Sequence, residues 1–360
     1  MAATVLHKTA QLGQSIWLDS ISRKLLMTGE LEDWIDKGVS GVTTNPSIFE
    51  QAIAKTTDYD GEIRALAGEG KSASDIYEFL TLQEVGAAAD VLRPVYDRTG
   101  GLDGYVSLEV NPLLAEDASS TVSEARRLFS ALSRPNVMIK IPATPEGVTA
   151  VETCIADGVN VNATLIFSTK QYVSVAEAYI GGLRQRAEKG LPLSVASVAS
   201  VFVSRIDTAA DALLSSKGED FSDLKGHIAL DNALMTYAEF QRIFATEPWN
   251  RLSKKGARVQ RPLWASTGTK NPAYSDVLYV ENLIGKDTVN TVPPATLNAF
   301  LEHGKAETRE DREPARLRLA RLAKSGVDLD AVCAKLLKEG LNAFNVAFDL
   351  LIQSLAKKMG

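Results

Sequence analysis

The sequence predicts an α/β fold, a (β/α)8 TIM barrel with additional helices. Short apolar runs alternate with longer helical patterns along the 360 residues, which is the signature of a parallel sheet. Eight such runs favour a closed barrel, and no G-x-G-x-x-G motif follows any of them, which weakens the competing open, doubly wound sheet. We find no linker, internal repeat or low-complexity tract, so we expect residues 1–360 to form one domain.

The expected strands are short segments that are either apolar throughout or alternate between apolar and polar residues. They are Ser15–Asp19, Gly41–Thr44, Tyr105–Val110, Val137–Ile141, Val159–Phe167, Val195–Val203, Pro262–Ser266 and Asp276–Leu283. Successive side chains of a strand point to opposite faces. Each strand should therefore present one face to the surrounding helices and the other to the barrel interior.

Helical spacing is found between these strands and after them. The expected helices are Asp75–Val91, Ser119–Leu132, Asp207–Leu214 and Asn232–Phe244. Segment Lys305–Arg321 is dense in charges of both signs, and we expect a solvated helix face there. A long amphipathic helix is expected at approximately residues 330–358, where apolar residues recur every three or four positions: Leu337, Leu341, Phe344, Phe348, Leu351 and Leu355. We expect this helix to pack on the barrel, but the same stripe fits a partner chain, so monomer and homodimer both stay open.

Composition narrows the classes of partner. The formal net charge is −6, the pI is about 5.4, and no basic block is present, so we expect no nucleic-acid partner. No signal peptide or apolar run of transmembrane length is found, and the two cysteines, Cys154 and Cys333, form no C-x-x-C motif. We therefore expect a cytoplasmic protein without a membrane partner. The three histidines lack metal-ligand spacing, so we expect neither a metal nor another cofactor.

Polar residues gather late in the expected strands, on the face opposite the apolar residues. These residues are Asp19, Asn45, Glu109, Lys140, Asn162, Thr164 and Ser266. Active sites of (β/α)8 barrels lie at the carboxyl ends of the strands. Packing alone poorly explains so many polar side chains at this end, so we expect them to form a site.

Lys140 carries the most specific chemical signal. It lies in Val137–Pro142, a segment without any other charge. Lysine is rarely buried unless it is paired or functional, and burial favours the neutral amine that attacks a carbonyl to form a Schiff base. The strand pattern alone leaves two interpretations open, a Schiff-base lysine and a structural ion pair with a carboxylate.

Asp19 and Glu109 are the carboxylates expected near this lysine. Schiff-base chemistry needs proton carriers, because a carbinolamine must lose water and a hydroxyl must lose its proton when a C–C bond breaks. Each carboxylate could instead form a salt bridge with Lys140, and one group could fill both roles.

Over nearly the whole chain, the sequence resembles the transaldolase family. The motifs that carry the resemblance are Trp17–Arg23, Gly41–Ser47, Ser107–Val110, Ile139–Thr144, Asn160–Ser168 and Ser200–Arg205. The chain length and the segment Asn290–Pro293 resemble the longer bacterial subgroup of that family.

The resemblance implies a class I aldolase-type barrel that moves a dihydroxyacetone unit between sugar phosphates. Sedoheptulose 7-phosphate and glyceraldehyde 3-phosphate would yield erythrose 4-phosphate and fructose 6-phosphate, a step of the non-oxidative pentose phosphate pathway. By position, Lys140 resembles the Schiff-base lysine, and Asp19 resembles the acid/base for C–C cleavage. Glu109 and Thr164 resemble the pair that positions the water for dehydration and hydrolysis.

The resemblance also implies a set of substrate-binding residues. They are Asn45 and Asn162 for the ketol hydroxyls, Arg205 with Ser266 for the phosphate, and Ser200 in the pocket wall. One departure concerns the phosphate site, where many transaldolases have an arginine two residues after the serine of the seventh strand. This chain has Gly268 there, so either Lys270 or Thr267 is expected to contact the phosphate.

Two other functions remain as alternatives. The first is a lyase that resembles fructose-6-phosphate aldolase and releases a free product instead of transferring it. The second is a sugar-phosphate-binding barrel without catalytic activity. The combination of Lys140, Glu109 and Asp19 favours an enzyme, because a binding protein has no need for a buried amine.

Overall fold

A closed barrel of parallel strands forms the centre of the molecule. The computed structural model describes residues 3–217, 219–308 and 312–360. Within these ranges, eight strands follow one another around the barrel in chain order. They are β1 (Gln14–Leu18), β2 (Val39–Thr43), β3 (Tyr105–Glu109), β4 (Val137–Pro142), β5 (Val161–Ile166), β6 (Ser197–Phe202), β7 (Arg261–Ala265) and β8 (Thr288–Val292). The predicted fold class is confirmed.

The prediction of the eighth strand is wrong. Segment Asp276–Leu283 contains the short helix α13 (Leu278–Asn282), and β8 lies further along the chain. Tyr279 and Val280 are buried in this helix, and an apolar run of this length does not distinguish a buried strand from a buried helical turn. Strand β8 has only two apolar residues among its five, and it is defined by its pairing with β1 and β7.

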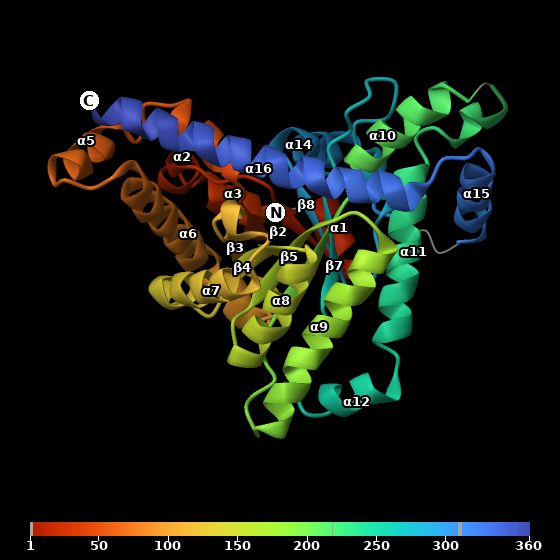
Figure 1. Cartoon of the computed structure of the whole chain (residues 1–360), viewed down its shortest axis with the longest axis horizontal. Coiled ribbons are helices and arrows are strands. Elements are labelled where there is room, and N and C mark those ends of the chain that lie inside the picture. Colours follow the sequence, from red (N-terminus) through yellow and green to blue (C-terminus); the bar gives the residue numbers. More distant parts are fainter. Residues whose placement is uncertain (1–2, 218, 309–311) are drawn as a thin grey trace.

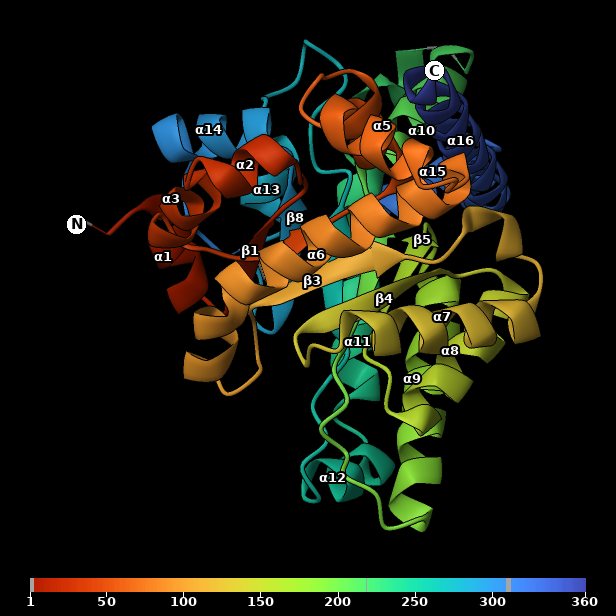
Figure 2. The same cartoon turned by 90° about the vertical axis from the view of Figure 1, so that its left-hand side faces the viewer.

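Helices surround the barrel (Figures 1 and 2). They are α1 (Val5–Gln11), α2 (Arg23–Met27), α3 (Glu30–Asp36), α4 (Pro46–Phe49), α5 (Asp60–Gly68), α6 (Ala73–Arg98), α7 (Ala118–Leu132), α8 (Pro145–Asp157), α9 (Thr169–Glu188), α10 (Ser204–Ser215), α11 (Ile228–Ile243), α12 (Glu247–Ser253), α13, α14 (Pro294–His303), α15 (Glu313–Lys324) and α16 (Leu329–Met359). Short π or 3-10 turns occur at η1 (Glu50–Ala54), η2 (Pro112–Leu114) and η3 (Glu219–Leu224). The expected helices correspond to α6, α7, α10 and α11, apart from Phe244, which caps α11. Within the described residues, every helix is too short or too polar to cross a lipid bilayer.

The charge-dense segment Lys305–Arg321 only partly matches its prediction. Helix α15 begins at Glu313, and residues 309–311 lie outside the described residues. Arg318 of this helix forms an ion pair with Asp231 of α11, with 2.5 Å between nitrogen and oxygen, and the Asp231 side chain is fully buried. A solvated face is therefore the wrong description of Arg318, because a buried carboxylate requires a charged partner.

Helix α16 crosses the end of the barrel at which the strands terminate (Figure 1). It contacts α4, α6, α10 and β5. The predicted apolar stripe faces the barrel, since Phe344, Phe348, Leu351 and Leu355 are buried and Leu337 and Leu341 are partly buried against the core. Near the end of α16, Lys358 Nζ lies 2.7 Å from Asp60 Oδ1. The helix is thus held on the barrel by packing and by a polar contact.

A polar cluster fills the opposite end of the barrel. Asp103 accepts hydrogen bonds from Ser15 Oγ at 2.5 Å and from Trp17 Nε1 at 2.9 Å, and it forms an ion pair of 3.0 Å with Arg261. Gly41 is required beside this cluster, because a Cβ there would lie 2.6 Å from the Trp17 ring. This cluster therefore lies at the end of the barrel away from the predicted site residues.

Candidate active site

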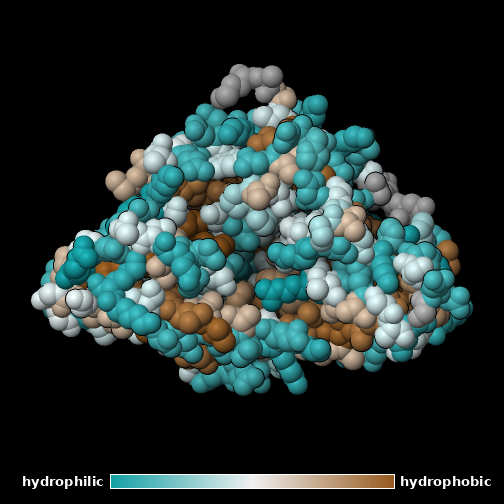
Figure 3. Space-filling view, turned by 90° about the horizontal axis from the view of Figure 1, so that it is seen from above, coloured by the Kyte–Doolittle hydropathy of each residue, from teal (hydrophilic) through white to brown (hydrophobic). Residues whose placement is uncertain are grey.

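A cavity of about 150 Å³ lies at the carboxyl ends of the strands. Seven predicted site residues line it: Asp19, Asn45, Lys140, Ser200, Arg205, Ser266 and Lys270. The other three, Glu109, Asn162 and Thr164, lie on β3 and β5, the strands that flank β4. The structure therefore brings the predicted residues together. The face of the molecule over which α16 passes is hollowed near its centre (Figure 3).

The alternation of β4 places the amine of Lys140 in the cavity. Val137, Ile139 and Ile141 are fully buried on the other face of the strand, and the Lys140 residue is only 4% exposed. Its Nζ donates a hydrogen bond to the Thr44 carbonyl at 3.0 Å and lies 3.8 Å from Glu109 Oε2. At 3.8 Å the two charged groups form an ion pair without a direct hydrogen bond.

Glu109 is paired with Lys140 in the register of β3 and β4. Burial raises the pKa of Glu109 to about 7, and Asp19 also raises it, while Lys140 lowers it. Neither carboxylate oxygen of Glu109 has a hydrogen-bond partner among the described residues, and the same holds for the buried hydroxyl of Thr164. Buried polar groups usually have partners, so these atoms are suited to a ligand or a water molecule.

Asp19 follows β1 and is half-buried. Its Oδ1 accepts a hydrogen bond of 2.7 Å from Thr43 Oγ1. Burial raises the pKa of Asp19, against the lowering effects of Lys140, Thr43 and Lys270. Asp19 and Glu109 are therefore two carboxylates that interact with one amine, both with a pKa above the ordinary value.

A chain of side-chain hydrogen bonds crosses the barrel below the amine. Ser200 Oγ donates to Asn162 Oδ1 at 2.6 Å, and Asn162 Nδ2 donates to Ser107 Oγ at 3.0 Å. All three side chains are buried. The chain fixes the orientation of the Asn162 amide, which is paired with Lys140 in the register of β4 and β5.

Asn45 begins α4 and lines the cavity from the end of β2. Its Oδ1 accepts a hydrogen bond of 3.0 Å from Ile48 N, as expected for an N-cap residue. The cap fixes the side chain, and in the described chain the NH₂ group of Asn45 donates to no other residue. This NH₂ group is therefore a hydrogen-bond donor in the cavity wall that a ligand can use.

Besides Lys140, two cationic residues line the cavity, Arg205 and Lys270. Arg205 lies in the first turn of α10, and its guanidinium carbon is 5.6 Å from the centroid of the Phe202 ring. Burial lowers the pKa of Arg205, an effect that Glu339 opposes. Ser266 adopts a left-handed backbone conformation with φ of 56°, and its hydroxyl lies 3.0 Å from Ser204 Oγ.

Lys270 and Thr267, the two candidates that the sequence left open, have different surroundings. Lys270 is exposed and lines the cavity. Thr267 is fully buried, and its hydroxyl donates to Asn290 Oδ1 at 2.9 Å. The Thr267 hydroxyl is thus hydrogen-bonded to β8, whereas Lys270 is part of the cavity lining and its ammonium forms no hydrogen bond with the described residues.

Eight residues of the cavity wall are absent from the predicted set of site residues: Thr43, Ser47, Phe202, Ala265, Gly268, Thr291, Pro293 and Phe344. Thr43 was predictable, because it lies two positions before Asn45 and so shares its face. Thr291 was not, because its strand was misplaced. Phe344 belongs to the apolar stripe of α16, and spacing alone does not reveal that this stripe reaches a cavity.

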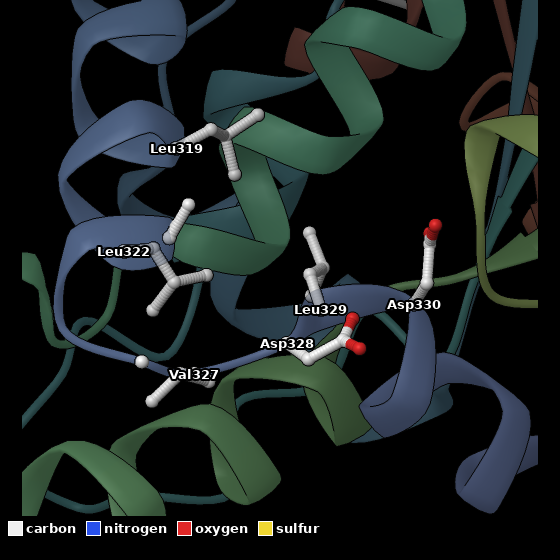
Figure 4. Close-up of a pocket in the computed structure, with 8 residues that line it drawn as sticks. Leu319, Leu322, Val327, Asp328, Leu329 and Asp330 are labelled. Carbon is white, nitrogen blue, oxygen red and sulfur yellow. The ribbon is translucent and has the colours of Figure 1, made fainter.

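A second hollow is mainly apolar. This hollow of about 470 Å³ between α15 and α16 is lined mainly by Leu319, Leu322, Val327 and Leu329 (Figure 4). The carboxylate of Asp328 there accepts from Ala331 N at 3.1 Å and caps α16. Among the described residues, no group of three or more His, Cys, Asp or Glu side chains is placed to hold a metal ion.

The fold and this site define the class of the protein: a (β/α)8 barrel with a buried lysine at the mouth, flanked by carboxylates. The chain matches the family described as Transaldolase/Fructose-6-phosphate aldolase over residues 16–355, and it belongs to that family. It is similar to the transaldolase of Trichodesmium erythraeum, with 45% identity over all of this chain and 98% of the relative. It is also similar to the transaldolases of Neisseria gonorrhoeae, with 44% identity over 98% of this chain and 99% of the relative, and of Thiobacillus denitrificans, with 46% identity over 95% and 97%.

Proposed function

We propose that the protein is a transaldolase, which transfers a dihydroxyacetone unit from a ketose phosphate to an aldose phosphate through a Schiff base on Lys140. One observation carries this proposal. The Lys140 amine is buried at the cavity, and the partnerless oxygens of Glu109 and Thr164 lie on the strands beside it. The names of the full-length relatives support the same activity.

Formation of the Schiff base begins when the neutral amine of Lys140 attacks the ketose carbonyl and gives a carbinolamine. Loss of the hydroxyl as water then requires a proton donor. Glu109 suits this step, since a pKa of about 7 lets it give and take a proton near neutral pH. We assign Glu109 and Thr164 to the water that leaves here and returns when the product is hydrolysed.

Cleavage of the C–C bond requires a base on the far side of the bond. Asp19 takes the proton of the hydroxyl on the carbon that leaves, and the bonding electron pair moves toward the iminium nitrogen to give an enamine. The aldose phosphate departs, and an acceptor aldehyde then reacts in the reverse sense. The amides of Asn45 and Asn162 and the hydroxyl of Ser200 bind the hydroxyls of the ketol unit.

The substrate phosphate binds beside the cationic residues of the cavity. We assign Arg205 and Ser266 to this group, since a guanidinium fork and a hydroxyl donate to phosphate oxygens. Lys270 is the additional ligand that we favour over Thr267, because Lys270 lines the cavity and the Thr267 hydroxyl bonds to Asn290. These groups supply the local positive charge that a protein of net charge −6 needs to bind an anion.

Borohydride trapping tests the proposal. Fructose 6-phosphate and borohydride should add a stable mass to the wild-type protein, and Lys140→Ala should lose the adduct. Lys189→Ala is the matched control, because this lysine is exposed at the C-cap of α9 and does not line the cavity, and it should keep the adduct. An adduct that persists in Lys140→Ala, or no adduct with any ketose phosphate, would contradict the proposal.

The two alternatives make different predictions. A lyase that resembles fructose-6-phosphate aldolase would cleave fructose 6-phosphate equally well with and without erythrose 4-phosphate or another acceptor. A binding protein without activity would bind the sugar phosphate but form no adduct. For a transaldolase, turnover depends on the acceptor, and the measurement is the rate of glyceraldehyde 3-phosphate release with and without it.

We also propose that the protein is a single domain that acts in the cytoplasm on small sugar phosphates, without a cofactor. Cys154 and Cys333 are both buried and unpaired, and burial raises the pKa of each thiol to about 12, which suits a reducing compartment. Monomer and homodimer are the two assembly states in question. Sedimentation velocity over a range of protein concentrations distinguishes them.

A further inference from the structure

We infer that Thr43 and Thr291 are positioning residues for Asp19: they form a chain of hydroxyls that holds its carboxylate ready to accept a proton during C–C cleavage. The inference rests on the proposed function and deepens it. The three residues belong to neighbouring parts of the barrel, because Asp19 follows β1, and β1 pairs with β2 on one side and with β8 on the other. All three line the same cavity.

The direction of the hydrogen bonds follows from the number of protons. Thr43 Oγ1 carries one proton and donates it to Asp19 Oδ1 at 2.7 Å. The Thr43 hydroxyl also forms a short hydrogen bond with the Thr291 hydroxyl. Since the Thr43 proton is already committed, Thr291 must be the donor in this second bond. The chain therefore runs from Thr291 to Thr43 to Asp19.

The chain divides the two oxygens of Asp19 between two tasks. Oδ1 is held by Thr43, while the described residues make no hydrogen bond to Oδ2, which leaves this oxygen to accept the substrate proton. Thr43 and Thr291 are 1% and 3% exposed, and β-branched side chains are stiff at χ1. Buried threonines thus aim their hydroxyls with little freedom.

The backbone anchors the same arrangement. Asp19 N donates to the Val292 carbonyl at 3.0 Å, and β1 pairs with β8 over the residues that precede Asp19. These contacts fix the position of Asp19 relative to β8. A hydroxyl chain that donates toward the carboxylate stabilises its charged form, in opposition to burial.

The step affected is cleavage, not Schiff-base formation. In cleavage, the substrate hydroxyl gives its proton to Asp19, the C–C bond breaks, and its electron pair neutralises the iminium as an enamine. The threonines gain and lose no proton. Schiff-base formation depends on Lys140 and Glu109, and the hydroxyls of Thr43 and Thr291 form their hydrogen bonds with each other and with Asp19 instead. Loss of the chain should therefore leave the six-carbon Schiff base intact and slow its conversion to the three-carbon intermediate.

The test is a Thr43→Val variant trapped with borohydride after brief reaction with fructose 6-phosphate. Mass spectrometry distinguishes the six-carbon phosphorylated adduct from the three-carbon adduct. We expect the ratio of six-carbon to three-carbon adduct to rise, and kcat to fall about 10- to 100-fold, the effect of one lost hydrogen bond to a charged group. Thr43→Ser should restore most of kcat, because it keeps the hydroxyl.

The pH profile gives a second readout. Without the Thr43 hydrogen bond, the pKa of Asp19 rises further. The deprotonated form of Asp19 then requires a higher pH, so the acidic limb of the kcat profile moves to higher pH. Thr291→Val, one bond further away, should shift this limb in the same direction by less. It also tests the chain if Thr43→Val does not fold. Thr81→Val is the control, since Thr81 is equally buried and bonds only to carbonyls of α6.

The outcomes are distinct. Suppose that the wild-type protein forms adducts, and that Thr43→Val and Thr291→Val have the same adduct ratio and the same acidic limb of kcat as the wild type. The inference is then overturned and the proposed function stands. If kcat of the variants is lower at every pH but the acidic limb and the adduct ratio are unchanged, the threonines have only a structural role, and the inference is also overturned. If the wild-type protein forms no adduct with any ketose phosphate, the proposed function itself fails.

Discussion

Glu109 interacts with Lys140 and Asp19 at the barrel mouth, and its protonation should affect the stability of the fold as well as the proposed catalysis. The structure raises the pKa of Glu109 from 4.5 to about 7, mainly by burial. Between these values the folded protein binds more protons at this site than the unfolded chain does. The stability contributed by this group is therefore highest in acid and falls as the pH rises toward 7.

A Glu109→Gln variant should lose this dependence. We expect the wild-type free energy of unfolding to fall relative to that of the variant by up to about 3 kcal/mol between pH 4.5 and pH 7.5, from the size of the pKa shift. Urea unfolding of both proteins across this range measures the difference. Parallel curves would contradict the raised pKa.

Lys270 and Thr267 should respond differently to substitution. Lys270→Ala removes a positive charge that lines the cavity, so KM for a phosphorylated ketose should rise about tenfold, with a smaller change in kcat. Thr267→Val removes a buried hydrogen bond to Asn290 and should lower the stability by about 1 kcal/mol without raising KM. Steady-state kinetics and thermal unfolding of both variants test this assignment, and the opposite pattern would reverse it.

At the scale of elements, α16 approaches β5 closely at Gly340. A Cβ at this position would lie 2.9 Å from Leu165 Cδ2 and 3.8 Å from Arg205 NH1. Leu165 has φ of 58°, an unusual conformation for leucine, at a point where the register between β5 and β6 shifts. It directly follows Thr164, so pressure from α16 on Leu165 would be transmitted to a proposed catalytic residue.

A Gly340→Ala variant should therefore separate stability from activity. Alanine favours the helix by about 1 kcal/mol, and the clashing methyl of Leu165 is the mobile end of a side chain, so the melting temperature should change little. We expect kcat to fall severalfold as Leu165 shifts. Gly61→Ala in α5 is the control, because an added Cβ meets nothing within 4 Å and activity should be unchanged. Unchanged activity in both variants would show that the approach of α16 is not important for the site.

At the scale of the whole molecule, the two ends of the barrel have different tasks. The polar cluster of Asp103, Ser15, Trp17 and Arg261 closes the amino-terminal end of the barrel, away from the cavity. In (β/α)8 barrels, residues at that end serve stability, and residues at the carboxyl ends serve catalysis.

Substitution of Asp103 should accordingly affect stability alone. Asp103→Ala leaves the buried guanidinium of Arg261 without its charged partner, which typically costs about 3–5 kcal/mol. Below the new melting temperature, KM and the yield of trapped adduct should match the wild type. Denaturant unfolding and trapping at low temperature measure the two effects, and a change in KM would show that the two ends are coupled.

The sequence could predict features that depend on neighbouring residues of one strand, but not features that depend on contacts between distant parts of the chain. Alternation along β3, β4 and β5 was sufficient to direct Glu109, Lys140 and Thr164 inward, because a strand has only two faces. Strand β8 escaped prediction because its five residues, Thr288–Val292, are mostly polar and become a strand by pairing with β1. The sequence also did not predict Phe344 as a cavity residue, because its position depends on how α16 lies across strands that are far away in sequence.

The position of Phe344 in the chain has a consequence for biosynthesis. Ribosomes add residues from the amino terminus onward, so every strand of the barrel, and the amine on β4, is made before this wall of the cavity. The emerging chain lacks this part of the wall until α16 has been synthesised. The cavity is therefore completed late in biosynthesis, when the final long helix settles across the strand ends.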